Sequence, residues 1–145
     1  MSYIYNRKTL YYETDQMAVM HHTNYLRWFE EARTEFLEAR GLPLYEIEKQ
    51  NILIPVIDAY SKYIKSVKFG DVCTVHLKIE LYTGSRVNLS YEIYNQNNEL
   101  CNTGSTKHCF INSSGKVLNL RKVLPELDEI FVKEVPAKTK ACSSK

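Results

Sequence analysis

The chain has 145 residues, with 19 basic and 17 acidic side chains and a formal net charge of +2 at pH 7. This length predicts one domain with a hydrophobic core, and the balanced charge excludes the strong basic excess of a nucleic-acid-binding protein. The sequence contains no apolar run near the ~20 residues that a membrane span requires. We therefore expect a cytoplasmic protein with neither nucleic acid nor membrane as a partner.

The first third of the chain predicts a strand followed by one long helix. Residues 3–12 are rich in tyrosine and predict a short strand. From Tyr25 to Arg40, apolar residues recur at spacings of three and four, which is typical of an amphipathic helix. Gly41 marks its end, because glycine readily adopts the left-handed conformation found there. One or two further helical turns are expected over residues 43–50.

The middle of the chain predicts strands. The proposed strands, rich in alternating or β-branched residues, span residues 52–65, 72–82, 86–94 and 100–111. Pro55 is expected at an edge or bulge because it lacks an N–H, and the broken alternation near Gly104 predicts a second bulge. Short turns make the last three strands an antiparallel meander.

The order of these elements predicts an α+β fold. The helix must bury its apolar stripe, and the concave face of the sheet is the only surface large enough. We therefore expect a curved antiparallel sheet wrapped around one long central helix. A short helix is expected over residues 124–131. The domain is predicted to span residues 1–132, followed by a flexible tail over 133–145, which is rich in lysine and serine.

Residues 13–25 join the first strand to the helix. Backbone N–H groups at a helix start have no partner within the helix and carry partial positive charge, which suits a developing oxyanion. Thr23 or Asn24 is expected to cap the helix. If the chain turns back after Asp15, its carboxylate would face the same space as the amide of His22. The alternative is that Asp15 only forms a turn and His22 packs against the sheet.

The segment 12–33, with the sequence YETDQMAVMHHTNYLRWFEEAR, resembles the signature of the 4-hydroxybenzoyl-CoA thioesterase family of hotdog-fold acyl-CoA thioesterases. The resemblance continues more weakly at residues 104–108. It implies that the chain has a hotdog fold and that the protein hydrolyses an acyl-CoA or acyl-carrier thioester without a cofactor. It also implies that Asp15 is the catalytic carboxylate and that the backbone N–H of His22 polarises the carbonyl. The role of Asp15 as nucleophile or general base stays open.

Ala18 departs from this family, which usually has glycine at the corresponding position. The alanine either narrows the substrate pocket or strains the turn. This departure keeps open the alternative of a hotdog module that binds acyl-CoA without hydrolysing it. A hotdog dehydratase is a further alternative. A second branch of hotdog thioesterases has its carboxylate on the central helix, where Glu30 and Glu31 are the candidates, although both fall on its polar side.

Further substrate contacts are expected around the same joint. Ala18, Thr23, Asn24 and Tyr25 are predicted to line the pocket. CoA carries phosphate groups, which basic side chains at a pocket mouth would bind. The candidates near strand ends are Lys65, Arg86 and Lys107, each of which also fits a solvated surface charge.

No metal site is expected. The neighbouring His21 and His22 have no acidic or cysteine ligand at a suitable spacing. The four cysteines, at positions 73, 101, 109 and 142, form no C-x-x-C pair and are expected to be free thiols. The family resemblance further implies a homodimer or homotetramer with active sites at subunit interfaces, which would also cover the edges of the sheet.

Overall fold

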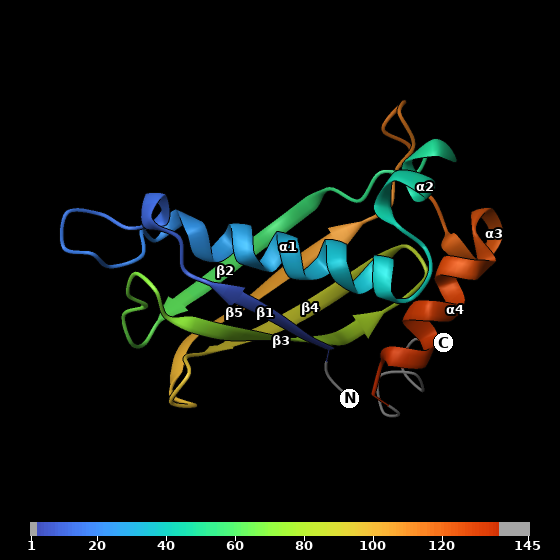
Figure 1. The fold of residues 1–145 in the computed structure, drawn as a ribbon. Coiled ribbons are helices and arrows are strands. Elements are labelled where there is room, and N and C mark those ends of the chain that lie inside the picture. Colours follow the sequence, from blue (N-terminus) through green and yellow to red (C-terminus); the bar gives the residue numbers. More distant parts are fainter. Residues whose placement is uncertain (1–2, 137–145) are drawn as a thin grey trace.

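The computed structural model describes residues 3–136 and shows a five-stranded antiparallel sheet that curves around one long helix (Figure 1). In spatial order, the strands are β1 (Tyr3–Lys8), β3 (Val72–Tyr82), β4 (Arg86–Tyr94), β5 (Leu100–Cys109) and β2 (Val56–Tyr63). The helices are η1 (Tyr11–Glu13, a 3₁₀ turn), α1 (Thr23–Ala39), α2 (Leu44–Lys49), α3 (Leu120–Val123) and α4 (Pro125–Glu134). The predicted fold class and the antiparallel meander of β3, β4 and β5 are confirmed.

The edge strand β2 is shorter than predicted. It begins at Val56, directly after Pro55, and its register with β5 shifts between Val56 and Asp58. Before the proline, Leu53 forms only an isolated bridge with Ile111. This is the behaviour expected of a proline at the start of an edge strand, because it cannot donate to the ladder.

The bulge predicted near Gly104 lies three residues earlier, at Cys101, where the register between β4 and β5 shifts between Ile93 and Tyr94, and Gly104 itself pairs in regular register with Tyr91. A Cβ atom at Gly104 would overlap the ring of Phe29 and lie 2.7 Å from the backbone oxygen of Tyr60. The Phe29 ring stacks on the Tyr91 ring at 4.2 Å between centroids. Glycine at this position therefore lets α1 approach the sheet closely, which explains the broken alternation.

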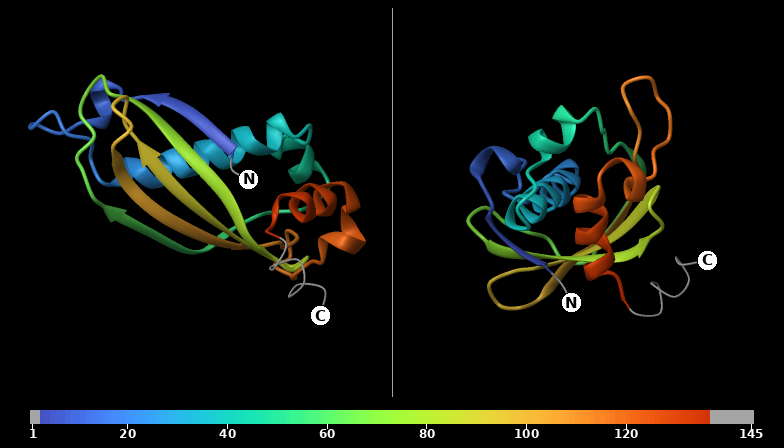
Figure 2. Two further views of the ribbon diagram at one scale, coloured as in Figure 1. Left: turned by 90° about the horizontal axis from the view of Figure 1, so that it is seen from below. Right: turned by 90° about the vertical axis from the view of Figure 1, so that its right-hand side faces the viewer.

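The core lies between the sheet and the helices. Trp28, Phe29, Ala32 and Phe36 are buried along one face of α1. Two further views show α1 in the hollow of the sheet and α4 packed near one end of it (Figure 2). Within residues 3–136, no helix is long and apolar enough to cross a membrane.

The C-terminal helix extends further than predicted. α4 continues to Glu134 and Val135 is buried, so the domain boundary expected at residue 132 falls too early. Packing against the core accounts for this, since Phe131 lies 5.2 Å from Tyr82 and 5.9 Å from Phe110 between ring centroids. The rest of the predicted tail, residues 137–145, lies outside the described part of the chain.

Candidate functional site

The segment between η1 and α1 is a closed loop. Its two ends meet in an antiparallel bridge between Thr14 and Met20, and the backbone N–H of His21 donates to the carbonyl oxygen of Glu13 at 2.8 Å. The loop also joins the neighbouring turn, because Val19 forms a bridge with Lys68. Residues 14–20 therefore form a hairpin whose second end leads directly into α1.

Asp15 lies near the beginning of this loop and is exposed. Its Oδ1 atom accepts hydrogen bonds from the backbone N–H of Met17 at 2.8 Å and of Val19 at 3.4 Å. The carboxylate thus shapes the turn, as the alternative interpretation expects. Its remaining oxygen, Oδ2, forms no hydrogen bond within residues 3–136.

Ala18 adopts a left-handed backbone conformation, with φ at 61°. Its N–H donates to the carbonyl oxygen of Asp15 at 3.0 Å, and its carbonyl accepts from Phe69 at 3.1 Å. This conformation costs an alanine on the order of 1–2 kcal/mol relative to the right-handed one. Of the two interpretations of the missing glycine, backbone strain is therefore the one that this geometry supports.

The helix start differs from the predicted cap. α1 begins at Thr23, and His22 occupies the N-cap position without a side-chain cap. The acceptor for the Thr23 N–H is the His21 ring, at 3.3 Å, so the expected capping by Thr23 or Asn24 is wrong. Asn24 is buried and donates to the Glu13 carbonyl instead, at 3.0 Å. Within the described residues, the backbone N–H of His22 donates no hydrogen bond.

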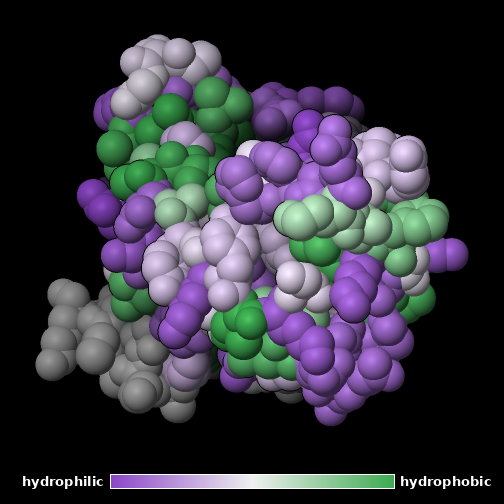
Figure 3. All heavy atoms as spheres, turned by 90° about the vertical axis from the view of Figure 1, so that its left-hand side faces the viewer, coloured by the Kyte–Doolittle hydropathy of each residue, from purple (hydrophilic) through white to green (hydrophobic). Residues whose placement is uncertain are grey.

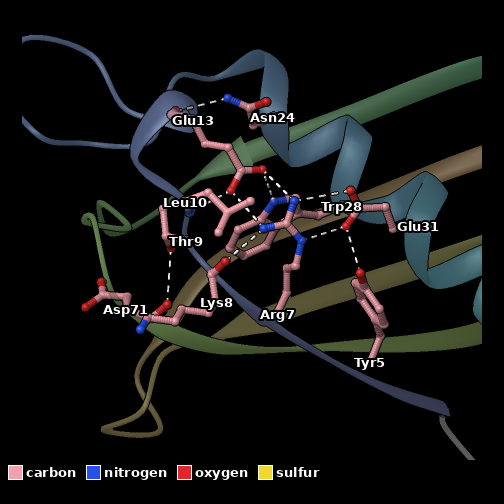
Figure 4. Close-up of polar contacts among 10 residues, drawn as sticks. All are labelled: Tyr5, Arg7, Lys8, Thr9, Leu10, Glu13, Asn24, Trp28, Glu31 and Asp71. Carbon is pink, nitrogen blue, oxygen red and sulfur yellow. Dashed lines mark hydrogen bonds and ion pairs between the residues drawn. The ribbon is translucent and has the colours of Figure 1, made fainter.

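A buried ion pair that the sequence reasoning missed holds the loop in place (Figure 4). The Glu13 carboxylate is 2% exposed and accepts a two-pronged pair of bonds from Arg7 at 2.8 and 2.9 Å. It also accepts from the backbone N–H of Leu10 and from Nε1 of Trp28, each at 2.9 Å. Each carboxylate oxygen thus receives two hydrogen bonds, which offset the cost of burying its charge.

The same arginine connects the loop to the middle of α1. Arg7 Nε donates to Glu31 at 2.8 Å, and the Tyr5 hydroxyl donates to the same carboxylate at 2.8 Å. Glu31, a candidate catalytic group in the sequence, is thus occupied by two partners. A signal for this network was present, since Arg7 shares the inward face of β1 with Tyr3 and Tyr5. A charged residue at such a position requires a buried partner.

The electrostatics of Glu13 follow from these contacts. Burial raises the pKa of Glu13, but the hydrogen bonds from Leu10 and Trp28 and the charge of Arg7 together outweigh it. The pKa of Glu13 therefore lies below its usual range, and the group is charged at neutral pH.

A cavity opens beside the helix start. It occupies about 470 Å³, continuous in part with solvent, and is lined by Val19, Met20, His22, Tyr25, Tyr63, Ile64, Lys65 and Ser66. Tyr25 is 3% exposed, and burial raises its pKa to about 12. Of the predicted site residues, His22, Tyr25 and Lys65 are brought together here, whereas Asp15 is not among the lining residues.

Large hydrophobic side chains are exposed at this end of the molecule. Tyr11, Tyr12, Met17 and Phe69 are among them. The space-filling view of this end shows hydrophobic patches interrupted by hydrophilic side chains (Figure 3). Of these residues only Met17 belongs to the loop that carries Asp15, so the surface around this loop is partly polar and partly hydrophobic.

The three predicted phosphate-binding residues lie apart. Lys65 lines the cavity and pairs with Glu99 at 2.6 Å. Arg86 lies at the start of β4 and pairs with Cys109, at the end of β5. The cavity lies toward the other end of β5, where Asn102 pairs with Tyr63. Lys107 is exposed and alternates with the buried Thr106 and His108. The structure therefore brings only Lys65 to the helix start.

Comparison with known proteins agrees with this architecture. The sequence model of the Thioesterase-like superfamily matches residues 10–140. "Putative acyl-CoA thioesterase YneP" of Bacillus subtilis is 36% identical over 124 residues, which covers 85% of this chain and 90% of that protein. A crystal structure of DHNA-CoA thioesterase from Staphylococcus aureus has 32% sequence identity and a TM-score of 0.88, covering 99% of this chain and 95% of that one.

A further relative, the 1,4-dihydroxy-2-naphthoyl-CoA hydrolase of Thermosynechococcus vestitus, is 26% identical over 105 residues, which covers 72% of each chain. The helix, the curved sheet and these similarities define a hotdog thioesterase, a hydrolase of thioesters. The chain belongs to the Thioesterase-like superfamily. The resemblance drawn from residues 12–33 is thereby confirmed at the level of hotdog acyl-CoA thioesterases, without a particular acyl group.

Proposed function

We propose that this protein hydrolyses an acyl-CoA thioester with Asp15 as the catalytic carboxylate and the backbone N–H of His22 as the oxyanion donor. The observation that carries this assignment is the closed loop 14–20. This loop carries Asp15 near its first end. The unpaired amide of His22 lies just beyond its second end, at the positive end of the α1 dipole.

The proposed chemistry needs only these two groups and water. As a general base, Asp15 takes a proton from a water molecule that attacks the carbonyl carbon, while the His22 amide stabilises the negative oxygen. The C–S bond then breaks, and the thiolate of CoA takes up a proton. As a nucleophile, Asp15 instead forms a mixed anhydride that water hydrolyses in a second step. Both routes release a free acid and CoA.

The acyl group is proposed to be aromatic. One similar protein is named a 1,4-dihydroxy-2-naphthoyl-CoA hydrolase, and another, with 32% identity over nearly the whole chain, is named a DHNA-CoA thioesterase. Apolar side chains line part of the space around α1, including Leu26, Val56 and Ala59 in a groove beside β2 that also contains charged residues. The apolar part of this lining suits a flat aromatic acyl group.

We further propose that a second copy of this chain completes the site. β2 is an edge strand, and its apolar residues Val56, Ile57 and Tyr60 are each about half exposed, at 49%, 49% and 56%. An edge with this much exposed apolar surface requires cover. A partner subunit would also wall the space between the exposed Asp15 and the open cavity at the helix start.

One experiment separates this proposal from its alternatives. The purified protein is incubated with 2-naphthoyl-CoA, hydroxyacyl-CoA and medium-chain acyl-CoA thioesters, and the products are identified by mass spectrometry. If the products are free acid and CoA, and Asp15→Ala abolishes their formation, the result supports a hydrolase with Asp15 as its catalytic carboxylate. An enoyl thioester indicates a dehydratase. Binding without turnover in both proteins indicates a non-catalytic module.

The assembly is tested separately. Light scattering after size-exclusion chromatography is expected to give twice or four times the 16.9 kDa mass of one chain. Ile57→Lys places a charge on the exposed β2 edge and is expected to shift the protein toward the monomer. A monomeric wild-type protein with full activity contradicts the proposed assembly.

A further inference from the structure

The start of α1 leaves one backbone N–H group free in a run of paired ones. The N–H of His21 donates across the loop at 2.8 Å, and that of Asn24 donates to the His21 carbonyl at 3.0 Å. The N–H of Tyr25 donates to the His22 carbonyl at 3.4 Å. The N–H of Thr23 donates to Nδ1 of the His21 imidazole at 3.3 Å. Within residues 3–136, the N–H of His22 is thus the one member of this run without an acceptor.

The first turn of α1 holds the peptide group to which this N–H belongs. That group joins His21 to His22, and its carbonyl is the one that accepts from the N–H of Asn24. Asn24 is itself anchored, because its buried side chain donates to the carbonyl of Glu13 at 3.0 Å. In a planar trans peptide the C=O and N–H bonds point in opposite directions. The free N–H therefore points away from the body of the helix.

The His21 side chain restrains the same N–H more directly. Its bond from the Thr23 N–H closes a cycle of atoms that runs through the backbone of His22 and includes the His22 amide nitrogen. The torsion angles on both sides of that nitrogen belong to the cycle. The Thr23 hydroxyl also lies 2.8 Å from Nδ1. Because a backbone N–H only donates, Nδ1 carries no proton and is the acceptor of these bonds.

The imidazole of His21 also packs on that of His22. Their centroids lie 4.3 Å apart, with 30° between the planes. On its other side, the His22 imidazole meets the Tyr63 ring edge-on at 6.4 Å. His22 and Tyr63 line the cavity beside the helix start, whereas His21 does not. His21 therefore reaches the cavity only through its neighbour.

We propose that His21 is a positioning residue, whose Nδ1 holds the Thr23 N–H and thereby directs the His22 N–H at the carbonyl oxygen of the bound thioester. This inference rests on the proposed role of the His22 amide as oxyanion donor. Such a donor stabilises the transition state only where its direction matches the developing charge. A less restrained N–H should therefore lower kcat and leave substrate binding almost unchanged.

The test separates the acceptor nitrogen from the aromatic ring that carries it. His21→Phe keeps a ring beside His22 and removes the acceptor. His21→Asn removes the ring but supplies an oxygen that accepts from the N–H two residues on, in a cycle of the same size. His76→Phe is the matched control, because His76 also has a ring nitrogen near a threonine hydroxyl, 3.2 Å from Thr74, but lies within β3. Steady-state kinetics give kcat and KM for a thioester that the wild type hydrolyses.

We expect kcat to fall roughly tenfold to a hundredfold in His21→Phe, as for a misdirected catalytic group, with KM close to that of the wild type. His21→Asn should recover most of this loss. His76→Phe should have the kcat of the wild type. His21 is exposed, so the melting temperature should change little in either of its variants.

A second readout does not depend on turnover. The protein contains four histidines, so labelling with ¹⁵N-histidine gives a simple spectrum that includes the backbone N–H of His22. Its order parameter is expected to be about 0.85, the value of a rigid backbone, in the wild type and in His21→Asn. In His21→Phe the order parameter should be clearly lower.

An unchanged kcat in His21→Phe would overturn the proposal. An equal fall in His21→Phe and His21→Asn would also contradict it, since the effect would then come from the imidazole and not from its acceptor. A rise in KM alone would place His21 in contact with the substrate and refute a positioning role. A wild type that hydrolyses no thioester contradicts the proposed function, whereas the order parameters still decide whether His21 restrains the His22 amide.

Discussion

Trp28 donates its indole N–H to the Glu13 carboxylate at 2.9 Å, which ties the core face of α1 to the residue that precedes the Asp15 loop. The backbone of Glu13 makes the second connection, because its carbonyl accepts from His21 at 2.8 Å and from Asn24 at 3.0 Å. Glu13, a buried residue, therefore holds both ends of the loop: it directly precedes the first end, and its carbonyl accepts hydrogen bonds from the residues that follow the second.

Glu13→Gln is expected to impair catalysis more than it impairs folding. Glutamine keeps two acceptor positions on one oxygen but loses the charged pair with Arg7, and breaking a buried pair costs about 3 kcal/mol of unfolding free energy. Because the loop is then held less firmly, kcat should fall while the KM for the thioester changes little. Steady-state kinetics and urea denaturation measure the two effects.

Glu31→Gln is the matched control for that substitution. Glu31 accepts from the same Arg7 at 2.8 Å and has no bond to the loop. Glu31 is 36% exposed whereas Glu13 is 2% exposed, so we expect a smaller loss of stability, with kcat close to that of the wild type. If kcat falls equally in both variants, Arg7 acts on the general stability of the domain and Glu13 has no special role in positioning.

Acid is expected to weaken the fold through His108. Burial and the charge of Arg33 lower the pKa of His108 from 6.5 to about 4, although the carbonyls of Ile54 and Pro55 oppose this. The unfolded chain therefore binds a proton near pH 6.5 that the folded protein does not accept until about pH 4. Unfolding free energy should fall by about 3 kcal/mol across this window through this residue.

His108→Gln removes this titration and serves as the comparison. Its stability at neutral pH is expected to be lower, since the bond from Thr106 is altered. Its loss of stability between pH 7 and pH 4 should nevertheless be about 3 kcal/mol smaller than that of the wild type. Parallel pH profiles of the two proteins would contradict this account, because they would show that His108 binds a proton as readily in the folded protein as in the unfolded chain.

Ala18→Gly is expected to stabilise the protein by about 1 kcal/mol, because glycine adopts the φ of 61° without strain. Activity should persist, since Ala18 is exposed. Gly115→Ala is the converse control: its φ is 84°, the added methyl group would meet no atom within 4 Å, and it should lose a similar amount. Thermal unfolding measures both. A destabilised Ala18→Gly would mean that the alanine methyl makes a contact that outweighs its strain.

The sequence predicts the elements well where periodicity governs them. Both β3 and β4 have the expected bounds, and α1 starts two residues before the predicted Tyr25 and ends one residue before Arg40. The prediction misplaces the bulge of β5, which lies at Cys101, because the alternation at Gly104 is broken by contact with the ring of Phe29, far away in the chain. Local alternation carries no information about such a contact.

The site is predictable only in part, for a related reason. Asp15 and His22 stand in one continuous segment, so their pattern is readable along the chain. The pair of Arg7 with Glu13 joins residues whose connection depends on the packed fold. Arg86 and Lys107 were chosen for their charge near strand ends, and charge alone does not indicate the end of the sheet or the face on which a residue lies.

The central claim is that the Asp15 carboxylate performs the chemistry, and Asp15→Asn tests it most directly. Asparagine can still accept the bonds from Met17 and Val19, so the loop should keep its shape. The control is Asp71→Asn, another aspartate that accepts from the backbone in a turn, at 2.8 Å from Lys68.

The decisive measurement is kcat for a thioester that the wild type hydrolyses. We predict that kcat falls by at least about a hundredfold in Asp15→Asn, the size expected for loss of a general base, with little change in Asp71→Asn or in either melting temperature. An Asp15→Asn protein that hydrolyses the thioester at the rate of the wild type would contradict the account.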